Sequence, residues 1–238
     1  MSWIVHLFRP KAELPVRAAA AVDAWRALPA VPETAGLVDT RFVVVDVETS
    51  GLNPRRDRLL SIGAVAVERM KLAPQHTFSV VLRNEVPSTR ENIALHGLTP
   101  AAQAAGAPPE DALADFLAFV GRSPCVAFHA DFDRTVLERA VRVVLGVRFD
   151  NPWLDLARLA PALAPEGRRV RGSLDDWVAH FRLRVHTRHN AVHDAQVAAE
   201  LFLILMARAN ARGVATLAAL RALDACRQRT MGGYIAGV

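Results

Sequence analysis

The stretch FVVVDVETSGLNP, residues 42–54, decides the fold, because in it an apolar run ends in two acids and a turn. Valine suits the pleated strand, and Gly51, Asn53 and Pro54 end the run too soon for a helix, so the sequence predicts a buried central strand. Side chains alternate along a strand, so Asp46 and Glu48 project from the same face. Two neighbouring carboxylates repel each other unless a cation neutralises them, and hard oxygen ligands suit Mg²⁺ or Mn²⁺. The pair predicts a metal site, and a solvated strand end without an ion is the open alternative.

The composition is that of an ordinary globular protein. Of the 238 residues 52% are hydrophobic and 22% charged, which predicts one domain of catalytic size with terminal extensions. The formal net charge is +5, and Lys11 and Lys71 are the only lysines. Arginine binds phosphate through two parallel hydrogen bonds, so the arginine excess indicates either a nucleic-acid partner or an arginine-biased genome.

Cysteine usage fits a cytoplasmic location, and hydropathy argues against a membrane partner. Cys125 and Cys226 lie far apart without CxxC spacing, so neither a zinc site nor a disulfide framework is expected, and a reducing cytoplasm fits. The most apolar later stretch, residues 197–206, is interrupted by Glu200. It is shorter than the roughly 20 residues that a spanning helix needs, so no membrane partner is predicted.

The rest of the chain predicts strands and helices in a mixed order. Further strands are expected at residues 59–69, 75–82, 124–128 and 153–157, and the short connections make the first three an antiparallel meander. Helices are expected at residues 18–28, 92–97, 108–120, 134–145 and 159–163, after the capping-box residue Ser173, and through Val197, Leu201 and Leu205. The expected fold class is α/β, with a mixed five-stranded sheet and helices on both faces.

Three separated motifs resemble those of one enzyme family. They are FVVVDVETSGLNP, FHADFD at residues 128–133, and HNAVHDA at residues 189–195. Together they resemble the DEDD superfamily of 3′-to-5′ exonucleases, in its histidine-containing DEDDh subgroup, and the chain is similar to the proofreading epsilon subunit of bacterial DNA polymerase III. The residues that carry the resemblance are Asp46, Glu48, Asp133, His189 and Asp194. The family's second motif usually reads His-Asn-Ala-x-Phe-Asp, so Phe128 and His129 depart from it here.

The resemblance covers roughly residues 40–210 and implies a ribonuclease H-like exonuclease domain there. Residues 1–39 are then an N-terminal helical extension, and residues 211–238 a C-terminal helical tail that packs on the domain or on a partner. The family uses two Mg²⁺ or Mn²⁺ ions, and two ions about 3.5–4 Å apart can clamp the attacking and leaving oxygens of a phosphodiester in line. By resemblance Asp46 bridges both ions, Glu48 and Asp194 hold the one that activates water, and Asp133 helps to hold the other.

The resemblance also implies roles for histidines. His189, with an unperturbed pKa of about 6.5, suits the general base. His193 is adjacent to Asp194 and is a rival base, but the family spacing selects His189. His129 is expected to be a packed histidine, with a catalytic role as the less favoured alternative, and Asp133 has an open alternative role as a helix N-cap.

The implied substrate is single-stranded nucleic acid, DNA in preference to RNA, degraded from its 3′ end to nucleoside 5′-monophosphates. The implied substrate-binding residues are Thr49, Ser50, Leu52 and His96, with Leu52 wedged against a base. The basic loop containing Arg168, Arg169 and Arg171 either guides phosphates or is solvated. A polymerase or repair complex is the implied further partner. An exoribonuclease that trims RNA is an alternative, since the 2′-OH is read elsewhere. A non-catalytic scaffold module is another, which the complete acid set disfavours.

Overall fold

The computed structural model describes residues 13–167, 170, 172–184 and 190–235 of the chain. Five strands in this part form one sheet in the order β3-β2-β1-β4-β5. Their bounds are β1 Phe42–Thr49, β2 Leu59–Glu68, β3 Lys71–Val81, β4 Cys125–Ala127 and β5 Trp153–Asp155. Strands β1, β2 and β3 pair antiparallel, whereas β4 and β5 run parallel to β1. The predicted meander, the mixed five-stranded sheet and the central position of the first strand are confirmed.

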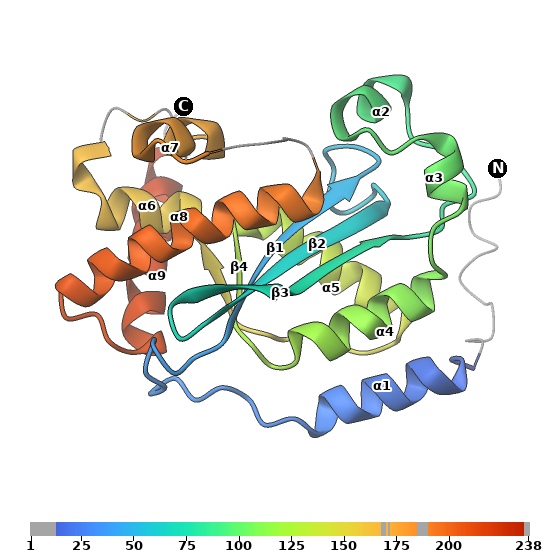
Figure 1. Cartoon of the computed structure of the whole chain (residues 1–238), viewed down its shortest axis with the longest axis horizontal. Coiled ribbons are helices and arrows are strands. Elements are labelled where there is room, and N and C mark those ends of the chain that lie inside the picture. Colours follow the sequence, from blue (N-terminus) through green and yellow to red (C-terminus); the bar gives the residue numbers. More distant parts are fainter. Residues whose placement is uncertain (1–12, 168–169, 171, 185–189, 236–238) are drawn as a thin grey trace.

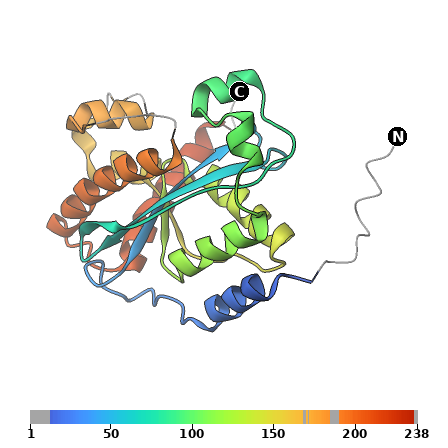
Figure 2. The ribbon, with the colours of Figure 1, turned by 45° about the vertical axis from the view of Figure 1, so that its right-hand side comes forward.

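Helices cover both faces of the sheet, as predicted (Figure 1). On one face lie α1 Val16–Ala27, α4 Pro109–Val120 and α5 Ala130–Val144. On the other lie α6 Leu156–Leu163, α7 Leu174–Phe181, α8 Ala191–Ala211 and α9 Leu217–Ile235. The short helices α2 Arg90–His96 and α3 Pro100–Ala104 lie beyond the ends of β1 and β2, as Figure 2 also shows from another side. Ser173 makes the predicted capping box at the start of α7.

Alternation along β1 divides its side chains between two cores. Val45 and Val47 face the core formed with α4 and α5, whereas Val44 faces the core formed with α6 and α8. Asp46 and Glu48 continue the series of Val44, so they project toward the face that α8 covers. The strand therefore turns both acids toward the start of a helix that lies about 150 residues further along the chain.

Strand β3 and the helices α5 and α6 begin earlier than predicted, and one helix was not predicted. Strand β3 begins at Lys71 rather than at residue 75, because Arg69 and Met70 both have positive φ and form a two-residue hairpin turn. The helix α3 was not predicted, although Thr99 caps it and Pro100 begins it.

The two terminal helices pack against the sheet domain. Helix α1 contacts α4, and Trp25 Nε1 donates a hydrogen bond to Gly121 O over 2.7 Å. Helix α9 contacts α6 and the edge strand β5. Over the residues that the structure describes, none of the helices combines the length and the apolar character that crossing a membrane requires.

Candidate functional site

Three of the predicted acids meet where β1 ends beside the start of α8. Ligand oxygens of Asp46, Glu48 and Asp194 all lie within 4.8 Å of one another. Asp194 is buried in the first turn of α8, and the two strand acids are half-buried. Carboxylates this close repel each other unless a cation lies between them, and hard divalent ions prefer such oxygen ligands. The donor set therefore fits Mg²⁺ or Mn²⁺.

Gly63 on β2 allows α8 to lie directly against the strands. It is the partner of Asp46 in the β1–β2 ladder. A Cβ atom at this position would lie 2.1 Å from the carbonyl carbon of Ala191 and 2.2 Å from Val192 N. Only glycine permits this approach, and the approach brings Asp194 to the strand acids.

Gly63→Ala is expected to push the first turn of α8 away from β2. Overpacking of this kind costs about 1–3 kcal/mol of unfolding free energy. Displacing a metal ligand by changing the groups that support it typically weakens metal binding about 10- to 100-fold. Thermal unfolding and a Mn²⁺ titration measure both effects. The matched control is Gly36→Ala, whose new Cβ would meet only the flexible carboxylate of Asp39 at 3.3 Å. Unchanged Mn²⁺ affinity in Gly63→Ala would contradict the role given to the glycine.

Asp133 approaches the site from the opposite face of the sheet. It lies in the first turn of α5, which begins at Ala130, four residues earlier than predicted. His129 occupies the N-cap position, so the alternative that Asp133 is the N-cap is wrong. Asp133 Oδ1 accepts a hydrogen bond from Val47 N over 3.2 Å. Because β4 ends at Ala127, the carboxylate satisfies a main-chain donor that the neighbouring strand no longer reaches.

The environment of Asp133 favours its protonated form. The pKa of this carboxyl is raised to about 8, mainly by burial, and the negative charges of Asp155 and Glu48 contribute to the increase. The hydrogen bond from Val47 N–H opposes the shift. A divalent ion beside Asp133 would reverse this balance, because a cation favours the ionised carboxylate.

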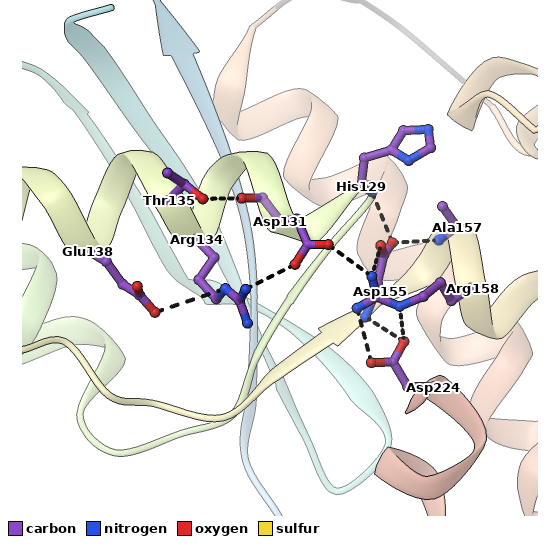
Figure 3. A network of polar contacts seen from close by, with 9 residues as sticks. All are labelled: His129, Asp131, Arg134, Thr135, Glu138, Asp155, Ala157, Arg158 and Asp224. Carbon is purple, nitrogen blue, oxygen red and sulfur yellow. Dashed lines mark hydrogen bonds and ion pairs between the residues drawn. The ribbon is translucent and has the colours of Figure 1, made fainter. Parts of the chain in front are cut away.

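An ion-pair network holds the turn that places Asp133 (Figure 3). Asp155, at the end of β5, accepts a hydrogen bond from His129 N over 3.0 Å, and its other oxygen lies 3.0 Å from Arg158 Nη1. Arg158 also binds Asp224 of α9 through two hydrogen bonds of 2.8 and 3.1 Å. Asp155, Arg158 and Asp224 all have side chains no more than 13% exposed. The network therefore joins α9 to the turn that leads into α5.

The left-handed backbone at His129 explains the residue type that this position accepts. His129 has φ 59°, a region that asparagine and histidine enter more readily than most residues. The ring points away from the ion pairs in Figure 3 and packs edge-on against Phe128, with the ring centres 4.9 Å apart. His129 is nevertheless exposed, so the expectation of a packed histidine is not met apart from this one ring contact.

No role follows from the sequence for the three residues of this network. Asp155 lies in the stretch LDLA at residues 154–157, which resembles a lesser motif of the DEDDh exonucleases, and this resemblance is the one signal that could have drawn attention to it. Asp224 carries no motif and lies 69 residues from Asp155, so only the packing of α9 on β5 relates them.

The loop after β1 carries three of the predicted substrate-binding residues. Thr49 Oγ1 donates to a main-chain oxygen two residues further on, over 2.6 Å. Ser50 Oγ accepts a hydrogen bond from Arg58 N over 2.9 Å, and Ser50 O accepts one from Asn92 Nδ2 of α2. Leu52, at the tip, is 88% exposed. The base of the loop is thus held in place while Leu52 is available to a ligand.

His96, the fourth predicted substrate-binding residue, is buried at the end of α2. Its Nδ1 accepts a hydrogen bond from Leu98 N over 3.0 Å, and its Nε2 lies 3.4 Å from Ser88 Oγ. Burial lowers the pKa of His96, so the neutral ring is favoured. These contacts give His96 a part in shaping the corner between α2 and α3, and its contact with substrate stays a prediction.

The two rival histidines differ in what the structure describes. His189, the predicted base, lies outside the described residues, as do Arg168, Arg169 and Arg171. His193 is exposed in the first turn of α8 and lines a hollow of about 310 Å³ with Arg182, Gln196 and Glu200. The described residues that line this hollow do not include Asp46, Glu48 or Asp194.

Comparison with known proteins identifies a family and several relatives. The exonuclease family model matches residues 43–202. The chain is 30% identical over 186 residues to DNA polymerase III PolC-type of Thermotoga maritima, over 78% of this chain and only 13% of that protein. It is 26% identical to DNA polymerase III subunit epsilon of Aquifex aeolicus, over 71% of this chain and 82% of that protein.

Solved structures share the fold. Exonuclease X in complex with 5′ overhanging duplex DNA matches with a TM-score of 0.58 and 25% identity, over 71% of this chain and 93% of that one. E. coli Exonuclease I in complex with a dT13 oligonucleotide matches with a TM-score of 0.60 and 17% identity, over 72% and 42% of the two chains. Because the family model covers more than half of the sequence, including all four acids of the motifs, this chain belongs to the exonuclease family and has its ribonuclease H-like fold.

Proposed function

We propose that this chain is a metal-dependent 3′-to-5′ exonuclease that releases nucleoside 5′-monophosphates from single-stranded DNA. The observation that carries the proposal is the convergence of Asp46, Glu48 and Asp194 within 4.8 Å, in a chain of the exonuclease family. DNA is favoured over RNA because Exonuclease X and E. coli Exonuclease I were both solved with DNA. The DNA polymerase III relatives support a polymerase as a further partner.

The carboxylates suit two Mg²⁺ or Mn²⁺ ions, which when bound supply charge neutralisation at the phosphate and activation of water. Asp46, Glu48 and Asp194 provide oxygen ligands for them, and Asp133 adds a fourth carboxylate once it has lost its proton. In this scheme His189 takes the proton from the attacking water. A bond then forms between the water oxygen and phosphorus, and the bond from phosphorus to the 3′-oxygen of the penultimate nucleotide breaks. The departing 3′-oxygen takes up a proton from solvent water.

The residues of the loop after β1 bind the end of the strand in this scheme. Thr49 and Ser50 hold the terminal nucleotide, and Leu52 packs against a base, which its exposure allows. Holding the reacting phosphate in one orientation increases the rate of its hydrolysis, so this loop contributes to turnover as well as to affinity.

Digestion of 5′-labelled single-stranded DNA and RNA, side by side with Mn²⁺ and with EDTA, tests the proposal. We expect stepwise shortening from the 3′ end with Mn²⁺, nucleoside 5′-monophosphates as products, and no cleavage with EDTA. A blocked 3′ terminus should protect the strand. Cleavage that survives EDTA would overturn the metal requirement. Faster cleavage of RNA would assign the exoribonuclease alternative, and binding of both polymers without cleavage would assign the scaffold alternative.

A further inference from the structure

A group of arginines lies beside the loop after β1, on the side of α5. We call it the arginine surface and define it as Arg55, Arg56, Arg58, Arg139, Arg142 and Arg148. Arg55, Arg139, Arg142 and Arg148 line one cavity of about 510 Å³. Arg56, Arg58 and Arg139 border an adjoining hollow of about 260 Å³, whose other lining residues are mostly apolar but include Asp57 and Arg83. Residues from the loop and from α5 thus share both hollows.

The arginine surface lacks the carboxylate partners that arginines have elsewhere in the chain. Arg17, Arg41, Arg122 and Arg208 each form an ion pair with an aspartate or glutamate. Within the described part of the chain, none of the six arginines forms one. The larger cavity has one acid, Glu138, which lies 4.0 Å from Arg134. Asp57 lines the smaller hollow, and its negative charge acts on Arg139. The other five guanidinium groups have no ion-pair partner among the described residues and can bind an external anion.

The loop after β1 connects the site of the three acids to the arginine surface. The loop that supplies Arg55, Arg56 and Arg58 begins directly after the strand that carries Glu48, and Leu52 forms its exposed tip. Arg139 donates a hydrogen bond to the main-chain oxygen of Asp57, which joins α5 to this loop. A nucleic-acid strand whose 3′ end lies at the acids could pass Leu52 and follow the loop after β1 to the arginine surface.

We propose that the arginine surface binds the phosphate backbone of nucleic acid beyond the terminal nucleotides. Guanidinium groups bind phosphate in a bidentate manner, and an apolar hollow between them can take a base or a sugar. The phosphates come either from the same strand, further from its 3′ end, or from the complementary strand of a duplex. The inference rests on the proposed function and narrows its substrate class to long polymers rather than short oligonucleotides.

Two triple variants with the same loss of charge test the inference. Arg55→Ala, Arg142→Ala and Arg148→Ala change exposed members of the surface. The control triple is Arg17→Ala, Arg26→Ala and Arg212→Ala, on α1 and at the end of α8. Arg212 lies roughly 27 Å along the helix axis from Asp194, at 1.5 Å per residue. Surface ion pairs contribute little to stability, so both triples should fold, and thermal unfolding verifies this.

Binding is measured in EDTA, which stops hydrolysis, with single strands of about 4 and about 20 nucleotides, lengths below and above the usual single-strand site size. We expect the surface triple to bind the long strand about ten-fold more weakly. The slope of log affinity against log salt should fall by about 2, since each phosphate contact contributes about 0.7. The loss for the short strand should be clearly smaller. Equal losses in the two triples, or an unchanged slope in the surface triple with both the long single strand and a duplex that carries a single-stranded 3′ end, would overturn the inference.

A duplex with a single-stranded 3′ end distinguishes the two sources of phosphate. If the surface triple binds only the duplex more weakly, the surface contacts the complementary strand. If it binds both the duplex and the long single strand more weakly, the surface contacts the cleaved strand. Arg142→Glu, a single reversal outside the loop, must weaken binding of at least one of these long substrates. Cleavage of the short strand by the unchanged protein in Mn²⁺ checks the proposed function separately. That function fails if no cleavage occurs, whatever the arginine variants show.

Discussion

Asp194→Asn is expected to lower turnover about a thousand-fold and to weaken Mn²⁺ binding in the same protein. The amide keeps the shape of the side chain but removes a negative charge from the cluster that Asp46 and Glu48 complete. Metal ions contribute several kcal/mol of transition-state stabilisation, and a loss of about 4 kcal/mol corresponds to about 10³ in rate. Turnover on 5′-labelled DNA and a Mn²⁺ titration measure the two effects.

Asp111→Asn is the matched control, because it makes the same change in the first turn of another helix. Asp111 lies in α4, beside Arg17, and belongs to the α1 and α4 side of the molecule. Its loss should leave turnover and Mn²⁺ binding at their original values. Normal Mn²⁺ affinity in Asp194→Asn would show that this carboxylate is not a ligand, even if turnover falls.

His189→Ala is expected to reduce turnover at least about 10²-fold, the usual loss when a general base is removed, and to leave Mn²⁺ binding nearly intact. The imidazole is not a metal ligand in the proposed scheme, so its loss separates proton transfer from metal binding. The fall of turnover at low pH, near the unperturbed histidine pKa of about 6.5, should disappear in this variant.

His193→Ala is the control for this experiment and should cost little. His193 is exposed and lines a hollow with Arg182 and Gln196. The described residues that line this hollow do not include Asp46, Glu48 or Asp194. A greater loss of turnover in His193→Ala than in His189→Ala would show that His193, and not His189, is the general base.

Local patterns in the sequence predicted most elements because they depend on neighbours along the chain. The alternation through Val45, Asp46 and Val47 sets the face of each side chain, and the structure has the two acids of β1 on one face. Boundaries were missed where local cues were weak. Arg69 and Met70 form a tight turn without glycine or asparagine, and α5 begins at Ala130 because the turn at His129 is held by Asp155 from another strand.

The sequence by itself determined the strand order of the meander, the motif acids and the family. Only the tertiary structure decided how close those acids come. Gly63 looks like any glycine in a strand, and its function depends on the main chain of α8, which packs on it from more than a hundred residues away. Asp224 likewise has no local signal, because its partners Arg158 and Asp155 are brought to it by the packing of α9. The arginine surface arises in the same way, since a loop and a helix that are distant in sequence contribute charges to one cavity. Spacing along the chain specifies side chains within one element, whereas distances between elements are set by how their faces pack.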